Sequence, residues 1–257
     1  MKNKLLLPGL LWIASLALAM TVFLPADAFA QSLTFDLGKQ TNGSAAARMI
    51  QLVALLTVIA LAPSILIMVT SFTRIVVVLS FVRSAIGLQQ TPPNQVLISL
   101  ALFLTLFVMQ PTFMKAWEDG IQPLMNEKIT EQQAMELTAA PFHMFMLHHV
   151  REKDLGLFMD MAGGEKGPLV VEKPEDTPWR VLIPAFMISE LKRAFEIGFL
   201  IFVPFVIIDM LVASILMAMG MMMLPPVTIS LPFKLIFFVL VDGWYMVCGS
   251  LVKSFGT

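Results

Sequence analysis

Charged residues are scarce in this 257-residue chain, at 14% against 58% hydrophobic residues. Soluble domains carry roughly 25% charged residues and about 45–50% apolar ones. The net charge is −1, so the chain has no basic excess with which to neutralise nucleic-acid phosphates. Cys248 is the single cysteine, which excludes an intrachain disulfide and a metal site built from cysteine pairs. With a mean hydropathy of +0.83, the composition is typical of an integral membrane protein and not of a soluble enzyme.

The first thirty residues have the pattern of a secretory signal peptide. Two lysines near the N-terminus precede a short apolar region, and Ala28-Phe29-Ala30 supplies the small residues of a cleavage site before Gln31. We therefore expect residues 1–30 to be a signal peptide cleaved between Ala30 and Gln31; an uncleaved first membrane helix is the alternative. Residues 31–47 are polar and are expected to form an N-terminal arm.

Four apolar blocks follow, in two pairs. They run over 49–88, 96–114, 181–219 and 227–252, and each is long enough to cross a bilayer. The first and third are long enough to form either one kinked helix or two half-helices. Proline-rich connections join the two blocks of each pair, which predicts two helical hairpins, 48–115 and 181–257.

The region between the pairs is polar, and residues 116–180 are predicted to form a small helical extramembrane domain. The segment 115–180 holds 12 of the 18 acidic residues, 7 of the 17 basic ones and all three histidines. The fold class expected is therefore all-α and membrane-associated, with two kinked hairpins flanking this domain. A cleaved signal places the N-terminus and the middle domain outside the cytoplasmic membrane. The histidine spacing predicts no metal site.

Charged residues inside the apolar blocks need partners. A charge at the bilayer centre costs about 2.5–3.5 kcal/mol on insertion scales, so about eight unpaired charges would cost on the order of 20 kcal/mol. Sequence spacing predicts local pairs of Glu190 with Arg193 and of Lys192 with Glu196. Alternatively, Glu190 pairs with Lys234 within or between subunits, or Lys192 and Arg193 extend toward the membrane surface.

Methionine is abundant, with 20 residues, and it is concentrated at one expected hairpin turn. Flexible, polarisable methionine side chains repack around changing partners. Met221, Met222 and Met223 could therefore either pack as ordinary apolar side chains or form a compliant seal around a pore.

Specific motifs resemble those of the FliP family of flagellar export proteins. They are Met68–Ile75, Gln89–Gln95, Pro184–Leu191, Met221–Pro226 and Leu231–Lys234, and the resemblance covers essentially the whole chain. It implies a homopentameric ring that assembles with FliQ and FliR, with FlhB at the entrance and FlhA in the same export apparatus of the inner membrane and flagellar basal body. It also implies a periplasmic middle domain, unfolded flagellar proteins as the transported cargo, and apolar hairpins that pack largely against one another.

The resemblance assigns roles to particular residues as well. Met221, Met222 and Met223 match the family's methionine gasket, and the charged residues of the third and fourth blocks fall at expected subunit contacts: Glu190, Lys192, Arg193, Glu196 and Lys234. No cofactor and no catalytic residue is implied. Two other classes are kept as alternatives: a secondary transporter or ion channel with Glu190, Arg193 and Asp209 as a relay, and an intramembrane enzyme, for which no nucleophile, base or metal set is found.

Overall fold

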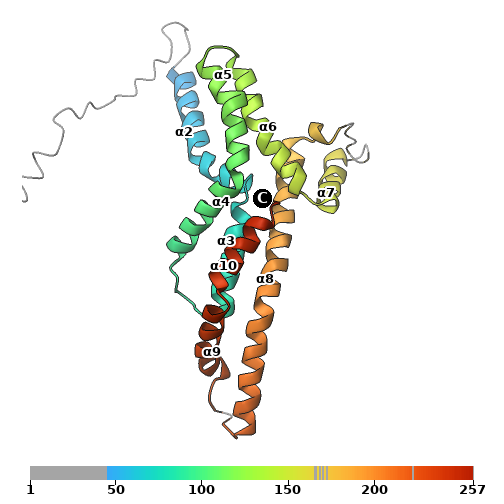
Figure 1. The fold of residues 1–257 in the computed structure, drawn as a ribbon. Coiled ribbons are helices and arrows are strands. Elements are labelled where there is room, and N and C mark those ends of the chain that lie inside the picture. The colour runs from blue at the N-terminus through green and yellow to red at the C-terminus, as the bar shows by residue number, and fades with distance from the viewer. Residues whose placement is uncertain are drawn as a thin grey trace, which may run out of the picture. The chain divides into compact units, whose positions relative to one another are not determined.

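The computed structural model describes residues 45–164, 167, 169, 171, 173–221 and 223–256, and these residues form helices and no strand. The expectation of an all-α chain is confirmed. The elements, labelled in Figure 1, are α2 (Ala45–Met68), α3 (Phe72–Ile86), α4 (Asn94–Ala116), the π-helical turn η1 (Trp117–Ile121), α5 (Gln122–Met125), α6 (Glu131–His149), α7 (Glu152–Gly163), the 3-10 turn η3 (Pro174–Asp176), α8 (Trp179–Ala218), α9 (Pro226–Leu240) and α10 (Gly243–Lys253). The predicted signal peptide, its cleavage site at Ala30 and Gln31, and residues 31–44 of the predicted arm lie outside the described residues.

The two longest apolar blocks adopt different structures. The first divides into α2 and α3 around the turn at 69–71, whereas the third is a single 40-residue helix, α8. Helix α8 contains Pro184 and Pro204 and continues through both prolines. Of the two forms left open by the sequence, the first block takes the half-helices and the third takes the long helix.

The fourth block, expected to form one arm of a hairpin, divides into two helices. α9 and α10 meet at an angle of 61°. Asp242 has a left-handed backbone with φ +51, which ends α9, and a Cβ on Gly243 would lie 2.2 Å from the Phe238 ring. The Asp-Gly pair thus permits both the change of helix direction and the close approach of an aromatic ring.

Helix α3 occupies the centre of residues 54–257, between α4 and α8 (Figure 1). Its side chains Ile75, Val78, Leu79 and Val82 are fully buried. The contact with α8 is close, because Gly198 faces the Phe81 ring and any Cβ there would lie 2.4 Å from a ring carbon. The same ring meets Phe195 and Phe202 of α8 edge to face.

The middle segment contributes helices that pack directly on the rest of the fold. α6 contacts α4, η1 and α8, and α7 lies along α8. α6 begins with a capping box between Thr130 and Gln133, and a second apolar cluster joins Met146 of α6 to Leu182 and Phe186 of α8. Helix formation in this segment agrees with its composition, and its core is continuous with that of α8.

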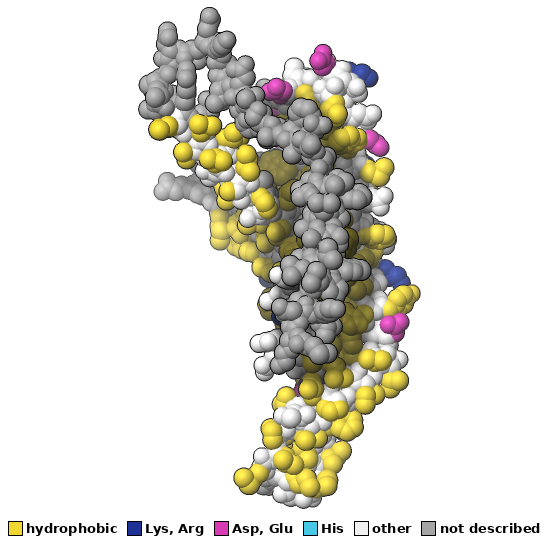
Figure 2. Space-filling model, turned by 90° about the vertical axis from the view of Figure 1, so that its left-hand side faces the viewer, with side chains coloured by type: hydrophobic (Ala, Val, Ile, Leu, Met, Phe, Trp, Pro, Cys, Tyr) yellow, Lys and Arg dark blue, Asp and Glu magenta, His cyan; other side chains and the backbone are white. Residues whose placement is uncertain are grey.

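Two continuous helical stretches among the described residues are long and apolar enough to cross a membrane, Asn94–Met125 and Trp179–Ala218. Two bent pairs, Leu52–Met68 with Phe72–Ile86 and Pro226–Leu240 with Gly243–Lys253, raise the number to four if each pair is one span. Only 11% of the most apolar window of α8 is buried within the chain. Figure 2 shows the resulting apolar surface, with hydrophobic side chains gathered at the end of the molecule where α8 meets α9.

Candidate functional site: the methionine turn and the buried charges

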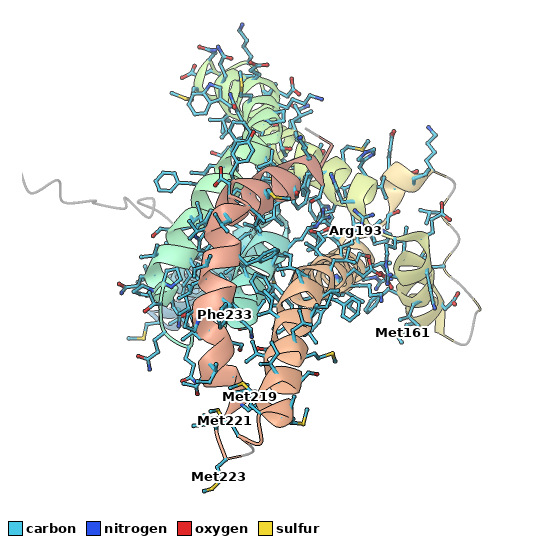
Figure 3. All side chains as sticks on the ribbon, turned by 60° about the horizontal axis from the view of Figure 1, so that its bottom comes forward. Met161, Arg193, Met219, Met221, Met223 and Phe233 are labelled. Atoms are coloured by element: carbon cyan, nitrogen blue, oxygen red, sulfur yellow. The ribbon has the colours of Figure 1, made fainter. Side chains whose placement is uncertain are left out.

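The turn between α8 and α9 exposes methionine side chains on a well-defined backbone. Gly220 adopts φ +74, and the N–H groups of Gly220 and Met221 donate to the carbonyls of Met217 and Leu216, which is a Schellman motif. Met219, Met221 and Met223 lie at this tip (Figure 3), and Met223 is 97% exposed. Met222 lies outside the described residues. The turn therefore presents flexible apolar groups that the described part of this chain leaves uncovered.

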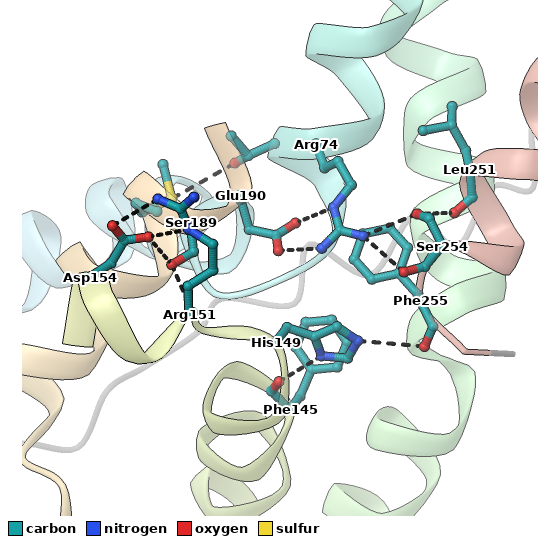
Figure 4. A network of polar contacts seen from close by, with 12 residues as sticks. Arg74, Phe145, His149, Arg151, Asp154, Ser189, Glu190, Leu251, Ser254 and Phe255 are labelled. Carbon is teal, nitrogen blue, oxygen red and sulfur yellow. Dashed lines mark hydrogen bonds and ion pairs between the residues drawn. The ribbon is translucent and has the colours of Figure 1, made fainter. Parts of the chain in front are cut away.

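A buried ion pair lies toward the other end of α8 (Figure 4). The Arg74 Nε donates to Glu190 Oε2 at 2.8 Å, and its second terminal nitrogen donates to Oε1, so the guanidinium and carboxylate pair in a two-pronged geometry. The Arg74 side chain is 1% exposed and that of Glu190 is completely buried. Because both charges are out of water, their bonds must be satisfied for the fold to tolerate them.

The Arg74 guanidinium also contacts the C-terminal segment, through its other terminal nitrogen and through the flat face of the group. Its other terminal nitrogen donates to the Ser254 carbonyl at 3.1 Å and to Ser254 Oγ at 3.0 Å. The guanidinium carbon lies 3.7 Å from the centre of the Phe255 ring, a cation–π contact. Arg74 therefore links α3, α8 and the C-terminal residues through one side chain.

His149 anchors α6 to the same C-terminal segment. Its Nδ1 lies 2.8 Å from the Phe145 carbonyl and its Nε2 lies 3.4 Å from the Phe255 carbonyl. Both partners accept hydrogen bonds, so a neutral imidazole can serve only one of them. Burial lowers the pKa of His149, and the two carbonyls oppose this effect.

A second charged cluster lies beside the first, between α7 and α8. Arg151 donates to both carboxylate oxygens of Asp154 at 2.8 and 2.9 Å, and the Ser189 hydroxyl donates to Asp154 Oδ2 at 2.7 Å. The hydrogen bond from Arg151 lowers the pKa of Asp154, with a further contribution from Ser189, and it raises the pKa of Arg151. The cluster fixes the start of α7 against α8.

A third pair joins α8 to α9 near the methionine turn. Lys234 Nζ donates to Asp209 Oδ2 at 2.6 Å, and the Ser230 hydroxyl donates to Asp209 Oδ1. Lys234 is buried, whereas Asp209 is half-buried. Both charged residues at this contact, Asp209 and Lys234, thus have a partner of opposite charge in the same chain.

These contacts correct the pairing expected from the sequence. Within the chain, Glu190 pairs with Arg74, not with Lys234 or Arg193, because the guanidinium occupies both carboxylate oxygens. Lys234 pairs instead with Asp209. The local pair of Lys192 and Glu196 is confirmed at 3.2 Å, with both side chains about half exposed.

A known protein family matches most of this chain, including most of the residues described above. The model of the FliP family matches residues 55–251, which include Arg74, Glu190, Asp209, Lys234 and the methionine turn. The chain belongs to the FliP family. It is 54% identical over 239 residues to the flagellar biosynthetic protein FliP of Agrobacterium fabrum, covering 93% of this chain and 97% of that protein.

Other FliP proteins show comparable similarity. The one from Caulobacter vibrioides is 56% identical over 244 residues, covering 95% of this chain and 90% of the relative. The one from Bacillus subtilis is also 56% identical, over 206 residues that cover 80% of this chain and 91% of the relative. Ser254 and Phe255, which complete the Arg74 site, lie beyond the part that the FliP family model matches.

Some contacts in this FliP-family chain have no signal in the sequence. Arg74 is one of the charged residues inside the first apolar block, and no sequence pattern predicts its contacts with Ser254 and Phe255. His143 and His149 lie in the expected helix and are buried, with ring nitrogens close to the carbonyls of Thr177, Phe145 and Phe255. Among the described residues no group of three or more histidines, cysteines and carboxylates is placed to hold a metal ion.

Proposed function

We propose that this chain is a core subunit of the flagellar type III protein export gate and forms a ring-shaped channel with FliQ and FliR. Unfolded flagellar proteins would pass through this channel across the inner membrane. Similarity to flagellar biosynthetic proteins FliP over 80–95% of the chain carries the proposal. The role requires no catalytic residue and no cofactor.

The exposed apolar surface supports assembly with other subunits. Helix α8 is the longer and more apolar of the two continuous candidate spans among the described residues, yet little of its most apolar part is covered within the chain. Exposed large side chains run along it, including Phe199, Leu200, Met210 and Leu211. We propose that neighbouring copies in a homopentamer, together with FliQ, FliR, FlhB and membrane lipid, cover this surface, and that FlhA acts in the same apparatus.

The methionine turn is proposed as the gasket of the channel. The Schellman motif fixes the backbone of the turn, while Met221 and Met223 project from it without cover in the described part of the chain. A ring of such turns would place Met221, Met222 and Met223 of each copy around one opening. Their flexible side chains would exclude ions yet move aside for a passing polypeptide.

Subunit contacts are proposed at the charged residues of α8 and α9. Lys192, Arg193 and Glu196 are at least partly exposed and could contact another subunit without rearrangement. Glu190 and Lys234 are buried and paired, so a contact between subunits would require each to exchange its present partner. The alternative role as an ion relay would require the carboxylates of Glu190 and Asp209 to release the cations that hold them.

The location proposed is the inner membrane at the flagellar basal body, with residues 116–180 in the periplasm. The apolar spans support the membrane assignment, and the acidic composition of the middle segment supports its exposure to water.

Secretion in cells tests this function. A strain that lacks the gene for this chain should release no hook or filament protein into the medium, and a plasmid copy should restore release. A matched copy carrying Arg74→Met should fail to restore it, because the fold loses its central charge pair. Normal secretion in the deletion strain would contradict the proposal.

A further inference from the structure

A groove with an apolar floor lies in the middle segment, between α6 and the chain that leads from η3 into α8. Its volume is about 810 Å³, within the range typical of binding sites. Ala139 and Ala140 form part of the floor, and their small side chains leave it hollow. Met135, Met144 and Trp179 line it with side chains that are all exposed, so the groove opens to solvent.

One wall of the groove is held in place by hydrogen bonds. His143 is buried in the floor and its Nε2 lies 2.7 Å from the Thr177 carbonyl, to which it donates. The Thr177 hydroxyl donates in turn to the Pro174 carbonyl at 2.6 Å. The Trp179 ring meets the His143 ring edge to face at 5.0 Å. The groove is therefore formed before any partner binds.

The charges at the groove all have one sign. Glu136, Glu175 and Asp176 line it and are exposed, and no lysine or arginine is among its lining residues. None of the three carboxylates takes part in the ion pairs formed among the described residues. An occupant that carries positive charge would find electrostatic complementarity at this groove.

We propose that this groove binds a segment of another protein that presents apolar side chains next to lysine or arginine. The alanine floor and the methionines bury the apolar side chains, and methionine adapts its shape to different occupants. The three carboxylates pair with the cations at the rim. A second copy that presented this same groove would bring its three carboxylates against these three, and like charges repel each other.

Binding of a defined peptide tests the proposal. The probe is acetyl-Lys-Leu-Phe-Lys-Leu-Lys-amide with a fluorescent label, titrated with the full chain in zwitterionic detergent at low salt and followed by fluorescence anisotropy. Saturable binding is expected, and a matched peptide with glutamate in place of lysine should not bind. The double variant Glu175→Gln, Asp176→Asn should weaken binding about tenfold.

A matched control separates this groove from general charge attraction. Glu152→Gln with Asp160→Asn removes the same charge from exposed positions of α7, outside the groove, and should leave the affinity unchanged. Ala140→Trp should abolish binding by filling the floor, while a thermal melt checks that this variant remains folded. The proposal would be overturned if the control pair weakened peptide binding as much as the groove pair does. It would also be overturned if the groove variants bound the peptide as tightly as the native chain. So would a disulfide between two copies carrying Met144→Cys in a Cys248→Ser background, since it would assign the groove to self-association.

Discussion

The two ends of α8 differ in how their side chains are held. Near its beginning, Glu190 is completely buried and is held by directed bonds from Arg74. At its other end, the turn at 217–223 exposes methionines that form no directed side-chain bond among the described residues. The directed bonds hold the side chains in one conformation, while the exposed methionine side chains can adopt many. The proposed role as an export channel would need both properties, a rigid frame and a boundary that yields to its cargo.

Breaking the buried pair should have the largest effect. Arg74→Met leaves the Glu190 carboxylate buried without its cation, which should lower the free energy of unfolding by about 3–5 kcal/mol. Thermal unfolding of the purified chain in detergent measures the loss. The double variant Arg74→Met, Glu190→Leu removes both charges and should recover much of the stability; a double variant less stable than the single one would show that the pair itself is not the cause.

Crowding the contact between α3 and α8 should have an intermediate effect. Gly198→Ala places a Cβ 2.4 Å from the Phe81 ring, which must shift, so the unfolding free energy should fall by about 1–3 kcal/mol. Gly249→Ala in α10 is the matched control, since its Cβ meets no atom within 4 Å. That control should be neutral or slightly stabilising. Equal melting temperatures for the two variants would contradict the close packing.

Lowering the pH should weaken the junction around His149 by a smaller amount. Burial holds the pKa of His149 below the unfolded value of about 6.5, so the unfolded chain binds the proton more readily. The contribution of neutral His149 is complete above pH 6.5 and is lost as the pH falls from there toward its folded pKa. Chemical denaturation across this range should show a shallower decline for His149→Gln than for the native chain. Identical pH profiles would exclude His149 as the source.

The methionine turn should show the smallest effect on stability. Replacing Met221, Met222 and Met223 by alanine should change the unfolding free energy of the isolated chain by less than about 0.5 kcal/mol, because Met221 and Met223 are exposed and exposed side chains contribute little. The same variant should make cells that carry the assembled gate leaky to ions and small solutes. A dye-uptake assay on cells with confirmed assembly measures this, and tight cells would count against the gasket.

Features that depend on residues close together in the sequence could be predicted from it. The long apolar runs predict the helices, the spacing of four residues predicts the Lys192–Glu196 pair, and the prolines mark the connections before α4 and α9. The break between α9 and α10 was missed, although Asp242-Gly243 carries a recognisable turn signal.

The partner of Glu190 could not be predicted in the same way. Arg74 is 116 positions away in the sequence, and Ser254 is 180 positions from Arg74, so helical periodicity gives no information about their meeting. Several basic residues were available, and only the packing of α3 against α8 selects Arg74. The position of Ser254 and Phe255 depends in addition on the break before α10, which redirects the chain toward Arg74.

Native mass spectrometry of the full chain, expressed with and without FliQ and FliR, tests the central claim most directly. The proposed function predicts a discrete homo-oligomer, expected to be a pentamer, that gains FliQ and FliR subunits when they are present. A monomer or dimer whose mass is unchanged by these partners would contradict the assignment of this chain as the core of an export gate.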